Sequence, residues 1–189
     1  MLDKKGNLFE NKKKFTLNAS PNDLKKELQA QIDLAKSIGI KPTHIDSHEG
    51  ALFFDQSIFK TYLDIGEENQ LPVFVPKEVA VHFDKSFPKP ENVVIVENMY
   101  MALPNLEFKD WSDYYVNVIE NLKPGLNEII VHLGYDDKEM QQITIEHPNY
   151  GSKWRNLDMD VVSSESFKQA IEKNNIKLVT WREIQKVIY

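Results

Sequence analysis

Short apolar runs that suit buried strands alternate with longer segments of helical periodicity along this chain. The apolar runs cover residues 71–76, 93–96 and 128–132, and the helical segments cover residues 21–38, 55–69, 110–122, 165–174 and 182–188. Such an alternation predicts an α/β fold with a mostly parallel sheet. The 189 residues suit one domain that spans the whole chain. In folds of this class, active sites collect where the strands end.

Turn signals support these boundaries. Ser20 precedes Pro21 and is suited to cap the first helix, while Gly39 is suited to end it. Residues 1–19 are polar and predict a loop or a short hairpin. Two further short strands are expected at residues 41–48 and 177–181. The polar stretch 133–162 is expected to be one long loop, and a loop of that length inside a domain is usually functional or disordered.

The composition argues against several function classes. With a formal net charge of −6, the chain lacks the basic surface that a general nucleic-acid binder needs to neutralise phosphates. It has no cysteine, so it has no disulfide framework, thiolate nucleophile or cysteine-based zinc site. No apolar run approaches the ~20 residues of a membrane span, and the N-terminus shows no signal peptide. These features predict a cytoplasmic protein without membrane contact.

A polar face is predicted for the strand at residues 41–48. Because side chains alternate along a strand, His44, Asp46 and His48 point one way. At ~3.3 Å per residue, His44 and His48 lie about 13 Å apart, too far to share one ion, whereas Asp46 and His48 are close enough. We therefore expect His48 to bind a metal, Asp46 to be its partner or to orient it, and His44 to be buried and hydrogen-bonded. If this segment were a helix instead, both histidines could chelate one ion. The other alternative is a polar strand end that binds no ligand.

His132 closes the apolar run at residues 128–132. A histidine at a strand end is suited to act as a general acid or base, or as a metal ligand. Gly134 permits a sharp turn after it, and Asp136 is suited to cap the next helix or to contact substrate. The alternative is a hydrogen-bonded histidine at a strand edge without a catalytic role.

The remaining candidates carry less specific signals. His82 and His147 fall in proline-rich segments, which predicts exposed loop positions. Arg155, in the polar stretch, is suited to hold a carboxylate or a substrate oxygen, or to form a surface salt bridge. Trp154 and Trp181 belong to the core or offer a face to a sugar ring. No Gly-rich phosphate loop or nucleophile elbow is present, so serine-based catalysis has no local support.

Three stretches of the chain resemble the YdjC/ChbG-like carbohydrate deacetylases. They are residues 41–48 (KPTHIDSH), 128–137 (EIIVHLGYDD) and 155–164 (RNLDMDVVSS), in the order and at the spacing of that family. Residues 2–9 also resemble a mid-chain segment of the family. The resemblance implies a partial, distorted (β/α) barrel that lacks the first strand–helix units.

The same resemblance implies hydrolysis of N-acetyl groups on amino sugars such as chitooligosaccharides, with a divalent metal ion (Mg²⁺ or Zn²⁺) as cofactor. His48 would be a metal ligand. His132 would be the catalytic residue, acting as an acid or base or stabilising the transition state. The residues that would support the site or contact substrate are His44, Asp46, Tyr135 and Arg155.

The chain also departs from the family pattern. Family members open with a strand that bears an Asp-Asp pair and carry a second early motif with another histidine, and neither is found here. Leu133 stands where the family usually has proline, and Glu49 follows His48 where many members have further histidines. A sheet without its first strands leaves a raw edge, which predicts association, including a homodimer.

Two other functions remain open. One is a catalytically inactive relative that binds a sugar or a partner protein. The other is an unrelated metal-dependent α/β hydrolase that uses Asp46, His48 and His132.

Overall fold

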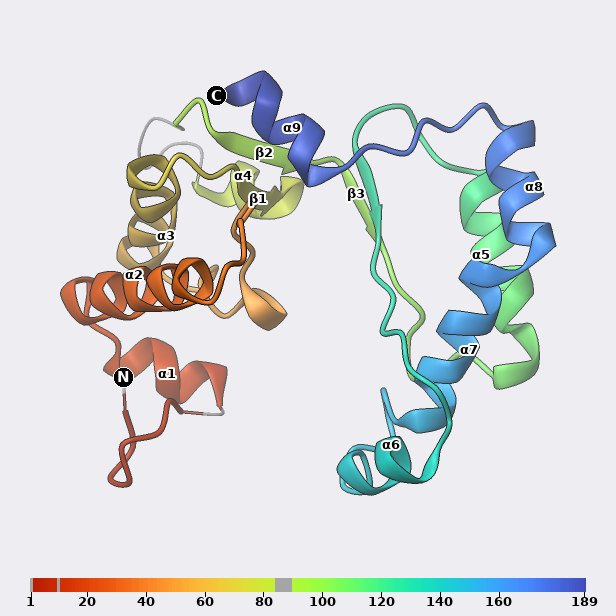
Figure 1. The fold of residues 1–189 in the computed structure, drawn as a ribbon, viewed down its shortest axis with the longest axis horizontal. Coiled ribbons are helices and arrows are strands. Elements are labelled where there is room, and N and C mark those ends of the chain that lie inside the picture. The colour runs from red at the N-terminus through yellow and green to blue at the C-terminus, as the bar shows by residue number, and fades with distance from the viewer. Residues whose placement is uncertain (1, 10, 84–89) are drawn as a thin grey trace. The chain divides into compact units, whose positions relative to one another are not determined.

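The computed structural model describes residues 2–9, 11–83 and 90–189 and divides the chain into two compact units, residues 1–96 with 179–189 and residues 97–178. Within the described ranges, each unit contains one pair of short parallel strands together with helices (Figure 1). The predicted α/β class and parallel pairing are confirmed, while the barrel and the single domain stay predictions. No helix in these ranges is long and apolar enough to cross a membrane.

In the first unit, a buried strand has neighbours on both sides. The described elements are α1 (Lys12–Asn18), α2 (Pro21–Ser37), η1 (His48–Gly50), α3 (Gln56–Glu68), β1 (Val73–Pro76), α4 (Lys77–Phe83), β2 (Val93–Val96) and α9 (Trp181–Ile188). β1 pairs in parallel with β2, and Ile45 forms a parallel bridge on the other edge of β1. The Ile45 N–H donates to the Pro72 carbonyl (2.9 Å), and the Ile45 carbonyl accepts from the Phe74 N–H (3.1 Å). All four residues of β1 are buried, as the apolar run predicts.

The first long helix of this unit begins and ends where the turn signals place it, and both long helices carry a side-chain cap. The Ser20 side chain accepts a hydrogen bond from the Asp23 N–H at the start of α2, and Asp55 caps α3 in the same way. Gly39 follows α2 with a φ of 88°, a left-handed conformation that glycine adopts without strain.

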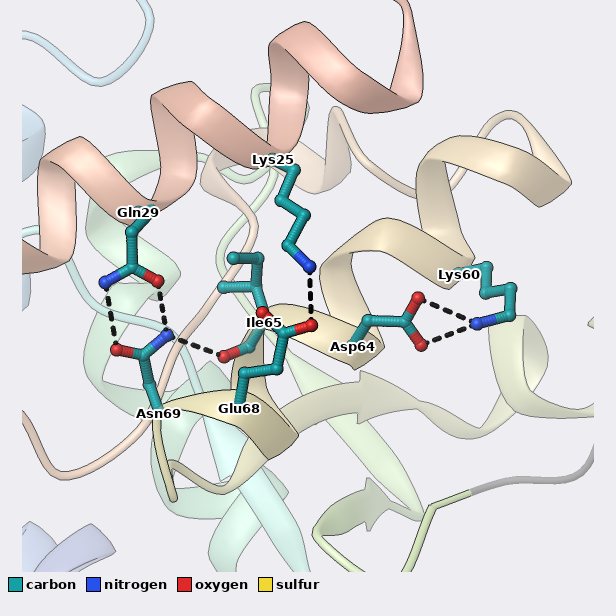
Figure 2. A network of polar contacts seen from close by, with 7 residues as sticks. All are labelled: Lys25, Gln29, Lys60, Asp64, Ile65, Glu68 and Asn69. Carbon is teal, nitrogen blue, oxygen red and sulfur yellow. Dashed lines mark hydrogen bonds and ion pairs between the residues drawn. The ribbon is translucent and has the colours of Figure 1, made fainter.

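A polar network joins α2 to the end of α3 (Figure 2). Gln29 Nε2 donates to Asn69 Oδ1 (3.2 Å), and Asn69 Nδ2 donates to Gln29 Oε1 (2.8 Å) and to the Ile65 carbonyl (3.0 Å). Lys25 pairs with Glu68, but both side chains are about half exposed, so this pair contributes at most ~1 kcal/mol. Burial of apolar side chains is the dominant favourable contribution to folding, so we expect the buried apolar residues of this unit to stabilise it more than this pair does. They include Leu24, Ile58, Phe59, Tyr62, Leu63, Val73 and Val75.

The second unit has a core rich in aromatic residues. Its described elements are β3 (Asn98–Tyr100), η2 (Phe108–Asp110), α5 (Trp111–Glu120), β4 (Asn127–Ile129), α6 (Lys138–Ile143), α7 (Ser152–Ser163) and α8 (Glu165–Lys173). β3 and β4 pair in parallel. The Trp111 and Trp154 rings meet edge to face, with centroids 4.7 Å apart. The buried residues of this core are Ala102, Trp111, Tyr115, Ile119, Trp154, Val161, Phe167 and Ala170.

The polar stretch 133–162 is not one long loop. It contains α6, which Asp137 caps, and most of α7, which buries Trp154, Asp158 and Val161 on one side. These three residues are spaced at four and three positions, so they form a narrow helical stripe in a segment that is otherwise polar. The prediction of a long loop was therefore wrong.

Two of the expected strands are reduced or absent. The segment 41–48 forms a single bridge at Ile45, and the 3₁₀ turn η1 begins at His48. Residues 177–180 form no strand, because Thr180 caps α9 in a capping box with Glu183. The helices α1 and α4 and the strand β3 were not expected from the sequence, and α4 places His82 in a helix rather than in a loop. An antiparallel bridge within the first ten residues matches the hairpin alternative.

Candidate functional site

Residues 44–48 have the two faces predicted for them. Ile45 packs against the core of the first unit, and Ser47 is buried with its hydroxyl accepting a backbone hydrogen bond at 2.9 Å. Asp46 and His48 are exposed. Asp46 and His48 therefore lie on the side of this segment opposite Ile45 and Ser47, as alternation along an extended backbone requires.

Tyr62 anchors this segment from the core side. Its hydroxyl lies 2.9 Å from two carbonyl oxygens, those of Ile45 and Phe74. Burial raises the pKa of Tyr62 well above its usual value, and the charge of Asp46 adds to the rise. The hydroxyl therefore stays protonated and holds the backbone beside Asp46 against β1.

His44 packs against an aromatic ring. Its ring is stacked on Trp181, with 4.1 Å between the centroids and 4° between the planes, and its Nδ1 lies 3.1 Å from the Thr43 hydroxyl. Burial lowers the pKa of His44, and the nearby Asp46 carboxylate acts in the opposite direction. His44 is thus hydrogen-bonded, as expected, but only half-buried, and Trp181 contributes to packing.

Acid is expected to destabilise the chain in part through His44. Its folded-state pKa lies below its ordinary value of 6.5, so the neutral ring contributes stability above that pH, and this contribution is lost as the pH falls through the folded pKa. Replacing His44 by phenylalanine keeps a ring against Trp181 and removes the titration. Urea unfolding should show a free energy of unfolding that falls less steeply between about pH 7 and pH 5 for H44F than for the wild type. A His147→Gln variant, which changes an exposed histidine, should follow the wild type, and an unchanged pH slope in H44F would contradict the prediction.

The turn that begins at His48 presents this histidine close to Asp46. Glu49 has a φ of 51° and Gly50 a φ of 68°, so the chain reverses sharply within η1. Lys12 holds the turn from α1, since its Nζ donates to the Glu49 carbonyl at 3.0 Å and lies 3.3 Å from the Glu49 carboxylate. One imidazole and one carboxylate fit the donor types of Zn²⁺ and Mg²⁺ sites. Yet no three His, Asp or Glu side chains group to hold a metal ion anywhere in the described part of the chain.

In the second unit, His132 follows the end of β4. The strand was expected to reach His132, but it ends at Ile129, because its partner β3 ends at Tyr100. The Ile130 N–H still donates to the Tyr100 carbonyl (2.8 Å), whereas the His132 N–H turns away and donates to Asp158 Oδ2 (2.8 Å). The half-buried His132 ring lies beside Tyr150, with the centroids 5.2 Å apart.

Asp158 is a fully buried carboxylate that organises this region. Its Oδ1 accepts hydrogen bonds from the Trp111 indole N–H (2.8 Å) and the Tyr115 hydroxyl (2.9 Å), and its Oδ2 accepts from the His132 backbone. Burial and the Asp158 charge raise the pKa of Tyr115 far above its usual range, so Tyr115 remains a donor at neutral pH. Asp158 thus links α5, α7 and the segment that carries His132. No role was predicted for this residue from the sequence; its place between Trp154 and Val161 on one helical stripe is the local signal that could have indicated its burial.

Arg155 and the segment after His132 are packed together. Arg155 lies on α7 rather than in a loop, and its Nε donates to the Tyr150 carbonyl (2.9 Å). A Cβ added at Gly134 would lie 3.3 Å from Arg155 Cβ and 3.0 Å from the end of Met140, so this backbone runs close to the helix. Tyr135, by contrast, is 65% exposed. The structure therefore brings His132, Arg155 and Asp158 into one unit, while His44, Asp46 and His48 belong to the other.

Comparison with known proteins places the chain in a family. The model of the YdjC-like protein family matches residues 1–173. The chain belongs to the YdjC-like family. A carbohydrate deacetylase from Clostridium beijerinckii is 24% identical over 186 residues, which cover 97% of this chain and 70% of that protein. A carbohydrate deacetylase from Thermoanaerobacter pseudethanolicus is 23% identical over 164 residues, which cover 87% of this chain and 61% of that protein.

A solved structure shows the same fold as this YdjC-like chain. It is a protein of Enterococcus faecalis V583 to which cellobiose-phosphate cleavage has been ascribed, and it superposes with a TM-score of 0.73 at 21% sequence identity. The match covers 97% of this chain and 68% of that protein. The family membership that the three short motifs predicted is thereby confirmed, and the matches cover nearly the whole chain.

Proposed function

We propose that this protein takes part in the metal-dependent hydrolysis of N-acetyl groups on amino sugars or chitooligosaccharides. The family and the relatives named carbohydrate deacetylase support the reaction class. The observation that carries the proposal is the placement of His132 just beyond the carboxyl end of a parallel strand, with its backbone fixed by the buried Asp158. Active sites of α/β proteins occur at that end of the strands.

His132 would act on the leaving amine. In the reaction, water adds to the carbonyl carbon of the acetamide, the C–N bond breaks, and the nitrogen leaves as an amine after it accepts a proton. A histidine is suited to give up that proton near neutral pH. The hydrogen bond from the His132 N–H to Asp158 fixes the backbone that carries the imidazole, and the ring lies beside Tyr150. The products are acetate and a free amino sugar.

Asp46 and His48 would contribute to the binding of the metal ion. Imidazole nitrogen suits Zn²⁺ and carboxylate oxygen suits Mg²⁺, and both side chains are exposed on one side of their segment. A bound divalent ion would supply polarisation of the acetyl carbonyl and of a water molecule. Two protein donors are fewer than the three that a catalytic zinc site takes, so the proposal requires a further donor besides these two.

Replacing His48 by alanine is expected to weaken Zn²⁺ binding to the 189-residue chain at least tenfold, since it removes one of the two protein ligands. Isothermal titration of the purified chain with Zn²⁺ and with Mg²⁺ measures this. His147→Ala is the matched control, because His147 is exposed in a turn before α7. Equal affinities for the wild type and for both variants would show that His48 is not a ligand of the metal ion.

The reaction itself is tested by acetate release. The 189-residue chain is incubated with N,N′-diacetylchitobiose and Zn²⁺ or Mg²⁺, and acetate is quantified by proton NMR. Acetate formation above a metal-free sample supports the proposal. Absence of acetate from a folded chain that binds metal would overturn it.

A further inference from the structure

A basic pocket lies in the first unit. It has a volume of about 650 Å³, which is within the usual range of ligand pockets. Its lining comes from the end of α2, from the segments that lead into Ile45 and into β1, and from α9. No described Asp or Glu belongs to this lining, whereas four of its residues carry a positive charge, namely Lys36, Lys41, Arg182 and Lys186.

These four cations form no ion pair with a carboxylate of the described ranges. Several other lysines do pair with Asp or Glu, namely Lys12, Lys25, Lys60 and Lys109. The chain has a formal net charge of −6, so acidic residues are plentiful elsewhere. Because like charges around one pocket repel each other, an anion that binds among them is attracted by all four.

The helix ends explain only half of these cations. Lys36 and Lys186 lie in the last turns of α2 and α9, where a cation offsets the roughly half negative charge of the helix end. Arg182 is the second residue of α9, near the positive end of that helix, where a cation is unfavourable. Lys41 lies in no helix. The positions of Arg182 and Lys41 therefore call for a negative partner other than a helix end.

The negative groups around the pocket amount to less than the four positive charges. α3 also ends here, with Asn69 as its C-cap, and contributes roughly half a negative charge. Tyr189 carries the α-carboxylate of this chain. Burial, and then the charge of Glu67, raise the pKa of the Tyr189 hydroxyl, but Glu67 itself does not line the pocket. A positive excess remains in the lining.

Arg182 is held in a defined orientation. Its Nη2 donates to the Lys41 carbonyl (2.8 Å), and its Nη1 lies 3.5 Å from Gln185 Oε1. Gln185 Nε2 in turn donates to the Gln70 carbonyl (3.4 Å), which ties α9 to the segment before β1. These contacts use only some of the guanidinium N–H groups, so others remain for a ligand. A planar guanidinium that is already oriented suits the bidentate recognition of a phosphate group.

The pocket lies at the opposite end of the strands from the proposed metal ligands. Ile45 and β1 run parallel to each other, and the lining residues 39–42 and 69–71 precede them in the chain. Asp46 and His48 instead follow Ile45. Because active sites of α/β proteins lie at the carboxyl ends of the strands, a ligand in this pocket is distinct from the substrate.

We propose that this pocket binds a small organic phosphate at a site separate from that of the deacetylation. Arg182 and Lys41 bind the phosphate oxygens, and the other two cations add attraction at longer range. A phosphate ester carries nearly two negative charges at neutral pH, which matches a pocket with several cations. The organic part of the ligand packs on the apolar lining residues Ile40, Pro42 and Leu71.

The test is calorimetric titration of the 189-residue chain, without added metal, with glycerol 3-phosphate and with glycerol as the uncharged control. A variant with both Lys41→Gln and Lys186→Gln should bind glycerol 3-phosphate about tenfold more weakly, roughly threefold for each lost charge. Both side chains are exposed, so the fold tolerates the change. Lys26→Gln is the matched control, because Lys26 is exposed on α2 and lies outside the lining.

Binding of glycerol 3-phosphate that weakens in the double variant and is kept in K26Q supports the proposal. Absence of binding to the wild type, unchanged affinity in the double variant, an equal loss in K26Q or equal binding of glycerol would each overturn it.

The His48→Ala variant tests whether the two sites are separate. It should bind glycerol 3-phosphate as the wild type does, because His48 does not line the pocket. A loss of binding in H48A would place the phosphate at the proposed metal site and would also overturn the inference. None of these measurements depends on acetate release, so failure of this inference and failure of the proposed reaction are distinguishable.

Discussion

Replacing Asp158 by alanine is expected to lower the free energy of unfolding of the chain by about 3 kcal/mol or more. The substitution removes the acceptor of three hydrogen bonds and leaves the Trp111 indole N–H, the Tyr115 hydroxyl and the His132 N–H without it. Asp158 itself is fully buried, so water has little access to these donors, and each buried donor left unsatisfied costs roughly 1–3 kcal/mol. Urea unfolding followed by tryptophan fluorescence measures the loss, because Trp111 and Trp154 pack in this core.

Asp160→Ala is the matched control on the same helix. Asp160 is exposed, and its carboxylate accepts a side-chain hydrogen bond from Asn156 four residues away. Its loss should change the free energy of unfolding by no more than about 0.5 kcal/mol. If D158A and D160A were equally stable, Asp158 would not organise the second unit, and the argument that it fixes His132 would fail.

The parts of the fold that the sequence predicted are those in which local signals agree with burial. α2 and α3 carry side-chain caps at Ser20 and Asp55 and bury an apolar stripe, and β1 is apolar throughout because it has a neighbour on each side. The expected strand at residues 177–181 had apolar residues but no partner, and Leu178 is 73% exposed. Strand propensity needs a neighbouring strand, whereas a capping box at Thr180 forms locally.

Alternation predicts which side chains of residues 44–48 face solvent, whereas the contacts of Asp158 depend on the tertiary structure. Alternation correctly separated Asp46 and His48 from the buried Ser47. Asp158 was missed because residues 133–162 were expected to be a loop, so its place on a helical stripe was not considered, and because its donors lie 43 to 47 residues earlier, on α5, and 26 residues earlier, at His132. Long-range pairing of this kind depends on the assembled core, which local sequence patterns do not encode.

Replacing His132 by glutamine is expected to lower the proposed deacetylase activity about 10²–10⁴-fold, the usual contribution of a positioned acid or base. Glutamine keeps a polar side chain of similar length but cannot exchange a proton in this pH range. The hydrogen bond to Asp158 comes from the backbone N–H, so the substitution leaves it in place. The loss should therefore appear in kcat for acetate release, with the free energy of unfolding changed by about 1 kcal/mol or less.

His147→Gln controls for the removal of a histidine from the same unit, because His147 is exposed, and it should keep wild-type kcat. The comparison with D158A then distinguishes a direct role of His132 in the reaction from the structural role of Asp158. If His132 is the proton donor, H132Q loses activity while it stays folded, and D158A loses activity together with stability. An H132Q variant with wild-type kcat would show that another group donates the proton. His132 would then have only a structural role, through its backbone hydrogen bond to Asp158 and its contact with Tyr150.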